Sequence, residues 1–371
     1  MYDTLITLLD KHNESIIIIS KKYNIKNIKV LERHPQNAQF KESINEMFTN
    51  NLDTNIEFIK ISYLSEDLKD LLKGKVLINL TGGKRIDSLE LFKLSLELNI
   101  DRVYLDILEK KEYFLGNGEK NILKDIDLNI EDILNSGGND LIYDSSNLSY
   151  KEDIKGYTEV IFNNIELWHK YKQRISDTSI FEHLYKDPKY VMIHKEKLEK
   201  EELKLLNKIL LNLKKEGKIK LMYEEETIKV EFLNDYLKGF IFKSGTWLEV
   251  FTENIIKELE GIDDVKSGLI FLWNKYDDVV RNELDVVAVK DSNMICISCK
   301  DSEKYDENAL NELSIYSEKL GGDKTKKILV STKKPLKQTI EKRAKEMGIY
   351  LVILNKDRER FKKELKSIID K

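Results

Sequence analysis

Short apolar runs alternate with amphipathic stretches of helical period through residues 1–110. Strands and helices that alternate at this spacing predict a parallel sheet with helices on both faces, a Rossmann-like unit. In open sheets of this kind, ligands bind beyond the carboxyl ends of the strands. The predicted elements, in chain order, are a strand over Thr4–Leu9, a helix over Glu14–Tyr23, a strand over Ile28–Leu31, a helix over Lys41–Asn50, a strand over Ile56–Ile61, a short helix over Glu66–Leu72, a strand over Val76–Leu80, a helix over Arg85–Leu98 and a strand over Arg102–Ile107.

The middle of the chain is more polar. One amphipathic helix is predicted over Ile154–Ile175 and a second over Lys195–Lys215, which Gly217 ends. The alternating segments Ile219–Tyr223 and Thr227–Phe232 predict a hairpin. A helix followed by a hairpin resembles a small winged-helix piece, and its mixed charge favours a spacer over a DNA reader.

From Gly239 onward, the pattern predicts a helix, a strand, a hairpin and then a helix–strand–helix–strand series. The hairpin is the most apolar part, because the runs Leu284–Val289 and Met294–Ile297 flank only four turn-forming residues. The later elements are a helix over Asn308–Leu320 that ends in Gly321-Gly322, a strand over Lys327–Ser331, a helix over Leu336–Met347 and a strand over Tyr350–Leu354.

Two charged residues lie within the apolar hairpin. Asp285 is inside the first strand, and Lys300 closes the second. A carboxylate and an ammonium group in buried strands are unfavourable unless they pair, bind a metal or take part in chemistry. The pair therefore marks either a catalytic site or a structural ion pair.

The charge balance excludes a generally basic nucleic-acid-binding surface but leaves room for a local basic groove. The 371 residues include 62 basic and 66 acidic ones, for a net charge of -4, and a hydrophobic share of 41% can form the cores of two or three domains. The two cysteines, Cys296 and Cys299, form a lone C-x-x-C on a strand, which predicts a reducing cytoplasm without a disulfide framework or a zinc site. Met1-Tyr2-Asp3-Thr4 lacks the basic region of a secretory signal, and no apolar run has membrane-spanning length, so a cytoplasmic protein with no membrane segment is expected.

Two loops, each between a strand and the following helix, have suggestive chemistry. Paired glycines let the backbone approach a ligand closely, and the start of a helix offers unpaired N–H groups. Two basic residues add charge for a phosphate. The spacing matches neither a Walker A loop nor a dinucleotide fingerprint, so the residues alone allow a phosphate-binding loop or a bare glycine turn. The loops are Asp10-Lys11-His12-Asn13-Glu14 and Thr81-Gly82-Gly83-Lys84-Arg85.

With Asn79 and Leu80 included, the second loop reads N-x-T-G-G-K-R, which resembles the loop after the fourth strand of CARF domains. These six-stranded, Rossmann-like domains sense cyclic oligoadenylate in type III CRISPR defence. The resemblance covers residues 1–145 and implies an activator, most simply cyclic tetra-adenylate, that lies across a two-fold homodimer interface. It implies ligand contacts from Asp10, Lys11, His12, Asn13 and Glu14 and from Thr81, Gly82, Gly83, Lys84 and Arg85.

The hairpin resembles the core of PD-(D/E)xK, or restriction-like, nucleases, in which an Asp on one strand and an acid-x-Lys on the next hold a metal beside a phosphodiester. The acid position here is Ser298, and a hydroxyl is a poor ligand for a hard cation. Glu249, in the first turns of a helix predicted to reach Leu259, is the expected substitute. Glu283 is a second candidate because it points to the same strand face as Asp285.

The nuclease resemblance implies a site for Mg²⁺ or Mn²⁺, which Asp285, Glu249 and the backbone carbonyl of Cys299 could hold. Lys300 would orient or help to deprotonate the attacking water, or stabilise the charged phosphate. The Cys299 side chain is expected to face the core on the opposite side of the strand.

Both sets of motifs occur in the order found in CARF-containing CRISPR ancillary nucleases, with W-L-E, N-E-L-D-V-V, I-S-C-K and N-E-L-x6-L-G-G after the N-terminal loop motif. The expected fold is α/β: a Rossmann-like CARF domain over residues 1–145, a linker and small winged-helix-like region over 146–238, and a restriction-endonuclease-like domain over 239–371. The leading hypothesis is a homodimeric, metal-dependent endonuclease, allosterically activated by cyclic tetra-adenylate, that cleaves DNA and, as a further substrate, single-stranded RNA. Two alternatives stay open: a ligand-binding regulator whose nuclease half has decayed at Ser298, and an unregulated restriction-like nuclease.

Overall fold

The computed structural model describes residues 2–32, 38–52, 54–61, 71, 74–116, 119–122, 127–184, 186–243, 245–273 and 281–371. The chain forms two compact units, each built from more than one segment. The first unit comprises Met1–Ser145, Ile255–Ile353 and Glu359–Lys371, and the second comprises Ser146–Asn254 and Leu354–Arg358.

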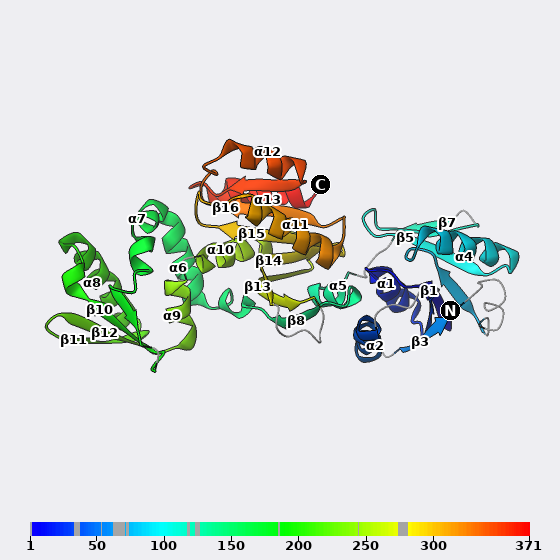
Figure 1. Cartoon of the computed structure of the whole chain (residues 1–371), viewed down its shortest axis with the longest axis horizontal. Coiled ribbons are helices and arrows are strands. Elements are labelled where there is room, and N and C mark those ends of the chain that lie inside the picture. The colour runs from blue at the N-terminus through cyan, green and yellow to red at the C-terminus, as the bar shows by residue number, and fades with distance from the viewer. Residues whose placement is uncertain are drawn as a thin grey trace. The chain divides into compact units, whose positions relative to one another are not determined.

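The N-terminal sheet of the first unit confirms the Rossmann-like prediction (Figure 1). Parallel strands in the order β3-β2-β1-β4-β5 are extended by the antiparallel strands β6 and β7, so the sheet has seven strands where six were expected. The strand order reverses between β1 and β4, which makes the carboxyl ends of these two strands the natural place for a ligand. The elements are β1 (Thr4–Leu8), α1 (Glu14–Tyr23), β2 (Asn27–Glu32), α2 (Ala38–Leu52), β3 (Asn55–Lys60), β4 (Val76–Asn79), α4 (Arg85–Glu97), β5 (Asp101–Asp106), β6 (Lys111–Phe114), β7 (Glu119–Ile122) and α5 (Ile130–Ser136). The helix predicted over Glu66–Leu72 falls almost wholly outside the described residues.

The C-terminal sheet of the first unit has six strands in the order β17-β16-β15-β14-β13-β8. An antiparallel meander of β13, β14 and β15 is followed by the parallel strands β16 and β17, and β8, from the predicted sensor segment, pairs with β13 at one edge. The strands are β8 (Asp140–Tyr143), β13 (Asp264–Leu272), β14 (Asn282–Lys290), β15 (Asn293–Lys300), β16 (Lys326–Ser331) and β17 (Ile349–Ile353). The helices are α11 (Glu307–Gly321), α12 (Gln338–Glu346) and α13 (Arg358–Ile369), while α10 (Thr246–Lys257) begins in the second unit and ends in the first.

Helix α13 was missing from the predicted series, which ended with a strand. Its polar sequence buries only Phe361, Leu365, Ile368 and Ile369, at a spacing of i, i+4, i+7 and i+8. That spacing is typical of an amphipathic helix, so the signal was present in the sequence.

One apolar core joins the two sheets of the first unit. Helix α5 contacts α1 and α2 on the N-terminal side and α11 and β14 on the C-terminal side. Its buried residues Ile133 and Leu134 belong to a cluster that also contains Ile17 of α1 and Leu313 of α11. Close-packed apolar side chains therefore extend from α1 through α5 to α11 on the C-terminal sheet.

The second unit contains a four-stranded sheet in the order β11-β12-β10-β9. The predicted hairpin is confirmed as β11 and β12, but the helix predicted over Ile154–Ile175 is two helices, because Asn164 adopts a non-helical φ of -122° and ψ of 33°. The helix predicted from Lys195 begins at Lys200. The elements are η1 (Ser146–Leu148), α6 (Glu152–Asn163), α7 (Ile165–Ile175), β9 (Phe181–His183), β10 (Tyr190–His194), η2 (Lys195–Lys197), α8 (Lys200–Lys215), β11 (Ile219–Tyr223), β12 (Thr227–Phe232) and α9 (Asp235–Phe242).

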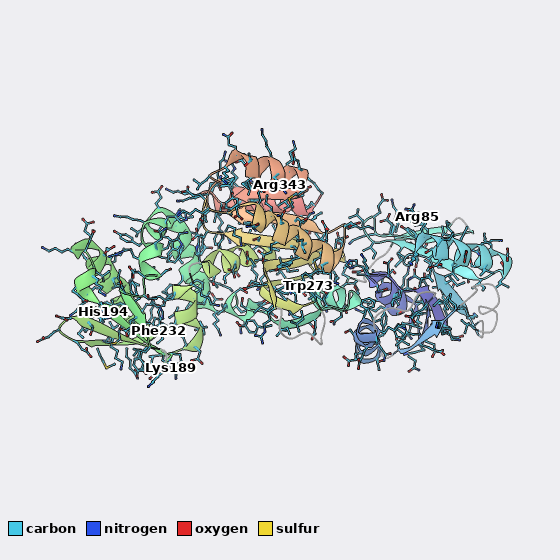
Figure 2. The ribbon with its side chains drawn as sticks, in the orientation of Figure 1. Arg85, Lys189, His194, Phe232, Trp273 and Arg343 are labelled. Atoms are coloured by element: carbon cyan, nitrogen blue, oxygen red, sulfur yellow. The ribbon has the colours of Figure 1, made fainter. Side chains whose placement is uncertain are left out.

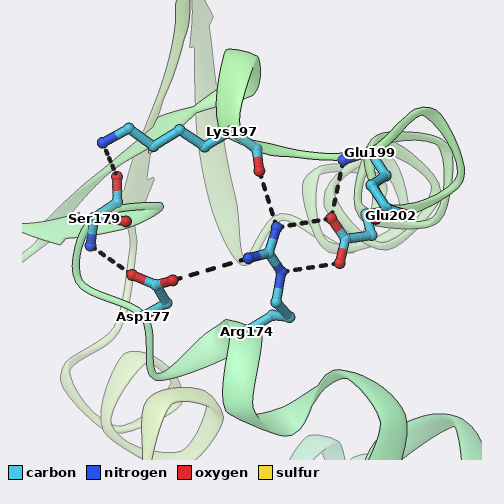
Figure 3. Close-up of polar contacts among 6 residues, drawn as sticks. All are labelled: Arg174, Asp177, Ser179, Lys197, Glu199 and Glu202. Carbon is cyan, nitrogen blue, oxygen red and sulfur yellow. Dashed lines mark hydrogen bonds and ion pairs between the residues drawn. The ribbon is translucent and has the colours of Figure 1, made fainter.

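Arg174 explains where α8 begins (Figure 3). Its guanidinium group donates to both carboxylate oxygens of Glu202, at 3.0 and 3.1 Å, and to the carbonyl of Lys197 at 2.9 Å. Glu202 also accepts the backbone N–H of Glu199 at 2.9 Å, as one half of a capping box. These contacts fix the helix start after Glu199. No helix in the described part of the chain is both long and apolar enough to cross a bilayer.

Candidate functional site

Strands β14 and β15 place Asp285, Ser298 and Lys300 together. One carboxylate oxygen of Asp285, Oδ2, accepts hydrogen bonds from Ser298 Oγ at 3.1 Å and from the Cys299 backbone N–H at 2.6 Å. The ammonium group of Lys300 lies 3.5 Å from the same oxygen, and the two side chains are 19% (Asp285) and 33% (Lys300) exposed. The predicted pair is thus formed on a hairpin that is otherwise buried, yet both charges reach solvent.

Lys300 is held in its charged form. Burial lowers its pKa, but the carboxylate charges of Asp285 and Glu312 raise it, and the pKa lies above its ordinary value. An ammonium group donates hydrogen bonds and cannot accept a proton. An ammonium group here suits orienting water and stabilising a phosphate, and the part of Lys300 in deprotonating the water stays a prediction.

The hairpin offers a partial set of ligands for a hard cation. Among the described residues, no donor bonds the second carboxylate oxygen of Asp285, and such a free oxygen fits Mg²⁺ or Mn²⁺. Glu283 is exposed and points to the same face of β14, about 6.5 Å along the strand. Glu249 is half-buried on α10, in the part of that helix that belongs to the second unit, so its role stays a prediction.

The two cysteines of the hairpin are buried. Cys299 is 7% exposed and contributes its backbone N–H to Asp285, while the use of its carbonyl for a metal stays a prediction. Cys296 is fully buried and lies beside Ser317, and burial raises the pKa of its thiol to about 12. Neither side chain is placed to act as a thiolate nucleophile.

Glu312 is a candidate residue that sequence reasoning missed. Its charge acts on Lys300, and the hydroxyl of Tyr316 donates to its carboxylate at 3.1 Å. Tyr316 in turn packs edge-on against Trp273, which Figure 2 labels. The residue belongs to the N-E-L segment that supported the family resemblance, so an acidic side chain inside a motif was the available signal.

A second acidic cluster lies at the other end of the hairpin. Carboxylate oxygens of Asp127, Asp263 and Asp291 come within 4.8 Å of one another, the one such group among the described residues. Asp291 is in the β14–β15 turn, about 20 Å along the strand from Asp285, and Lys110 forms an ion pair with it. This cluster is separate from the Asp285–Lys300 pair.

Replacing Ser298 with glutamate tests whether this strand position faces a cation. Ser298 is 8% exposed and bonded to Asp285, so an added carboxylate is expected to lower stability by about 2–4 kcal/mol in metal-free buffer. Mn²⁺ should restore most of that loss. Thermal unfolding of Ser298→Glu and of the neutral control Ser298→Gln, with EDTA and with Mn²⁺, checks this. A glutamate variant that Mn²⁺ does not stabilise would show that Ser298 packs only against protein.

The two predicted sensor loops meet where the strand order reverses. The Asp10 carboxylate accepts the backbone N–H of Gly83 at 3.0 Å and that of Lys11 at 2.7 Å. Gly83 has a φ of +88°, and a Cβ there would lie 2.5 Å from Leu8 Cβ, so only glycine fits. Because the N–H of Gly83 is already bonded, this amide is not free for a phosphate.

A buried polar network under the loops explains the asparagine of the N-x-T-G-G motif. The side-chain amide of Asn79 donates to the hydroxyls of Thr7 and Ser15, both at 3.1 Å, and its oxygen accepts the N–H of Thr81 at 3.0 Å. Thr81 Oγ1 accepts the N–H of Leu105 at 2.9 Å. Asn79 therefore holds the Thr81–Arg85 loop in place through buried hydrogen bonds, a role that sequence reasoning did not assign.

The ten predicted ligand residues differ in whether their side chains are exposed or buried. Lys11, Lys84 and Arg85 are exposed and have no side-chain partner among the described residues, and Figure 2 labels Arg85 at the start of α4. Asn13 is 1% exposed and bonds the backbone of Asp10 and the carbonyl of Ser136, so it holds the first loop in place, and its contact with a ligand stays a prediction. The three free cations are the groups available to an anionic ligand.

His12 faces the C-terminal sheet's helix α11. A Cβ built at Gly322, directly after α11, would lie 3.2 Å from its ring, and its Nδ1 lies 3.6 Å from Glu14. Burial lowers the pKa of His12, but Glu14 and Asp10 raise it more, so the pKa is above its ordinary value. Protonation of a histidine beside a helix C-terminus is favoured by the helix dipole.

The paired glycines that end α11 are explained by two close approaches. A Cβ at Gly321 would lie 2.4 Å from Thr325 Oγ1 and 2.8 Å from Met294 Cβ of β15. Gly322 has φ +74° and ψ -169°, and a Cβ there would lie 3.2 Å from the His12 ring. The L-G-G part of the motif thus lets α11 touch both its own sheet and the first sensor loop.

Comparisons with known proteins agree with this geometry. Residues 235–370 match the family model described as Card1-like, endonuclease domain. Can2 from Sulfobacillus thermosulfidooxidans, solved in complex with cyclic tetra-adenylate (cA4), shares the fold with a TM-score of 0.72 and 19% identity over 99% of each chain. VC1899 from Vibrio cholerae matches with a TM-score of 0.75 and 19% identity over 98% of this chain and 97% of that one.

A type III CRISPR defence DNA nuclease activated by cyclic oligoadenylate matches with a TM-score of 0.54 and 13% identity over 93% of this chain. This chain covers 52% of that protein's length. No curated protein sequence matches the chain. The motif-based resemblance agrees with these comparisons: residues 235–370 match a Card1-like endonuclease domain model, and the chain shares the fold of Can2.

Proposed function

We propose that this chain is a metal-dependent endonuclease of type III CRISPR defence, activated by a cyclic oligoadenylate, with cyclic tetra-adenylate as the expected ring size. In this proposal residues 1–145 sense the activator, 146–238 act as a spacer and 239–371 cleave DNA, with single-stranded RNA as a further substrate. The observation that carries the proposal is the Asp285–Lys300 pair, solvent-accessible within a Card1-like endonuclease domain.

The proposed chemistry assigns each group a separate task. Asp285 binds the cation through its free oxygen, and Glu249 or Glu283 completes the carboxylate set that Ser298 cannot supply. A cation held there would supply an activated water and neutralise charge at the phosphate. Lys300, as a fixed ammonium, orients the water or stabilises the phosphate oxygens.

Activation by a sensor ligand is supported by two features of the first unit. Three free cations, Lys11, Lys84 and Arg85, lie on the two loops at the strand-order reversal, where an anionic ligand is expected. His12, on the first of these loops, contacts the end of α11, which packs on β15. A ligand at the loops can therefore act on the strand that ends in Lys300.

A homodimer is supported by an exposed apolar stripe on α4. Ile86 and Leu89 are each 58% exposed and Leu96 is 46% exposed, at positions i, i+3 and i+10 of one helix. Residues at this spacing share a face, and water-exposed apolar faces favour association. Sedimentation equilibrium with and without cyclic tetra-adenylate would show a monomer if the stripe has another role.

Cleavage assays separate the proposed function from its alternatives. Purified protein is incubated with plasmid or labelled RNA, Mn²⁺ or Mg²⁺, and each cyclic oligoadenylate in turn. Cleavage only with ligand supports the proposal, and cleavage without ligand supports an unregulated nuclease. No cleavage under any condition, together with tight ligand binding, supports a regulator with a decayed nuclease half.

Removing both loop cations tests the sensor site. The double variant Lys84→Ala/Arg85→Ala is expected to bind cyclic tetra-adenylate more weakly by about 1–3 kcal/mol for each charged hydrogen bond that the substitution removes. Lys93→Ala, on the same helix but paired with Glu97, is the matched control and should bind normally. Calorimetric titration measures both. Wild-type affinity in the double variant would show that the Gly-Gly segment is only a turn.

A further inference from the structure

A short basic loop follows β16 directly beside the Asp285–Lys300 pair. It comprises residues 332–337, with the sequence T-K-K-P-L-K, and is called the basic loop below. Its placement follows from the strand register, because Ser331, the last residue of β16, pairs with Lys300, the last residue of β15. Neighbouring parallel strands end at the same edge of a sheet, so the loop leaves the sheet where Lys300 stands.

Hydrogen bonds hold the basic loop to the chain that follows Lys300. The N–H of Thr332 donates to the carbonyl of Lys300 at 3.2 Å, and Thr332 Oγ1 donates to the buried carboxylate of Asp301 at 2.8 Å. The hydroxyl of Tyr305 donates to the carbonyl of Lys333 at 3.1 Å. Burial raises the pKa of Tyr305 to about 12, so this donor keeps its proton throughout the neutral range. The loop backbone is therefore fixed relative to Lys300.

The lysines of the basic loop point to solvent without partners. Lys333, Lys334 and Lys337 are exposed, as is Lys304 in the segment after β15, and none has a side-chain hydrogen bond or ion pair among the described residues. Elsewhere on this sheet several lysines are paired, for example Lys290 with Asp370. In a chain of net charge -4, free cations gathered at one sheet edge form a local basic surface.

We propose that Lys333, Lys334 and Lys337, with Lys304, bind the phosphodiester backbone of the nucleic-acid substrate next to the cleavage site. The inference rests on the proposed nuclease function and adds the surface that holds the strand. The loop offers ammonium groups and one exposed aliphatic residue, Leu336, but no aromatic ring for base stacking. Such a surface contacts phosphates and reads no sequence.

The salt dependence of binding distinguishes phosphate contacts from a structural role. The triple variant Lys333→Ala/Lys334→Ala/Lys337→Ala is compared with Lys345→Ala/Lys366→Ala/Lys371→Ala in the full chain, with cyclic tetra-adenylate and Ca²⁺ present. The three control lysines are also exposed but lie toward the opposite edge, where Lys366 and Lys371 line a hollow with Asp291 of the hairpin turn. Fluorescence anisotropy with a labelled duplex and a labelled single strand, between 50 and 300 mM KCl, gives the slope of log K against log salt.

The loop variant should show a slope reduced by about 0.9 for each phosphate of duplex DNA that it no longer neutralises and about 0.7 for each phosphate of a single strand, hence by roughly 2–3 in total. Its affinity at low salt should fall about 10- to 100-fold, and the control should keep the wild-type slope. Equal slopes in the loop variant and wild type, with nucleic acid bound by both, overturn this inference alone. A wild-type protein that binds no nucleic acid overturns the proposed function together with the inference.

Discussion

We expect the Asp285→Asn variant to lose cleavage by at least about 10³-fold, which corresponds to about 4 kcal/mol of transition-state stabilisation. Asparagine keeps the shape of the side chain and an oxygen that can accept the N–H of Cys299, so the hairpin should stay folded. It removes the negative charge that the cation and Lys300 require. Cleavage rates at saturating Mn²⁺ and activator, with thermal unfolding as a folding check, measure the effect.

Two further variants test which residue supplies the second carboxylate ligand of the cation. Glu249→Ala is expected to abolish cleavage and weaken metal binding as Asp285→Asn does, while activator affinity stays unchanged. Full cleavage by Glu249→Ala, with loss in Glu283→Gln, would transfer the role to the strand neighbour of Asp285. Cleavage by Asp285→Asn near the wild-type rate would make the Asp285–Lys300 pair a structural ion pair.

His12→Ala is expected to uncouple sensor and nuclease. The activator should still bind, because Lys11, Lys84 and Arg85 remain, but its stimulation of cleavage should fall about 10-fold or more, within the usual range of coupling free energies. The reason is the contact between the His12 ring and the end of α11, the helix that packs on β15. Cleavage rates with and without cyclic tetra-adenylate, together with calorimetric affinity, separate coupling from binding.

A matched histidine serves as the control for this variant. His194 has nearly the same side-chain exposure, 26% against 25%, and also lies beside carboxylates, but it belongs to the second unit (Figure 2). His194→Ala should keep the full stimulation. Gly322→Ala perturbs the contact from the other side and should reduce stimulation as well. Unchanged stimulation in both His12→Ala and Gly322→Ala would remove this route of coupling.

The alternation of apolar runs located most elements because burial dictates composition. All five residues of β1 are buried, and α1 buries every residue from Ser15 to Ser20, so both read as apolar runs. Helix α13 was missed although its amphipathic spacing was present, whereas two other errors came where local geometry overrode the pattern. Asn164 divides one predicted helix into two, and the Arg174–Glu202 hydrogen bonds delay the start of another to Lys200.

The charged residues of the candidate site could be predicted from the sequence, but their neighbours in space could not. A charge inside an apolar strand is conspicuous in any sequence, which is why Asp285 and Lys300 were found. Glu312 and the basic loop were not found, since surface acids and lysines are common and only the fold shows which of them act on Lys300 or lie beside it. The same holds for Asn79, whose importance depends on the hydroxyls of Thr7 and Ser15 beneath the loop.

The sequence by itself determined the α/β class, the two sheets with their hairpin, the charged pair and the two sensor loops, because periodicity and burial act over short distances along the chain. Only the tertiary structure showed which of these elements and loops contact one another. It placed Asp10 on the N–H of Gly83, turned His12 away from the loop surface toward α11, and set the basic loop beside Lys300. Such contacts join residues that are far apart in the sequence and depend on how elements pack, and packing leaves no periodic trace in a single sequence.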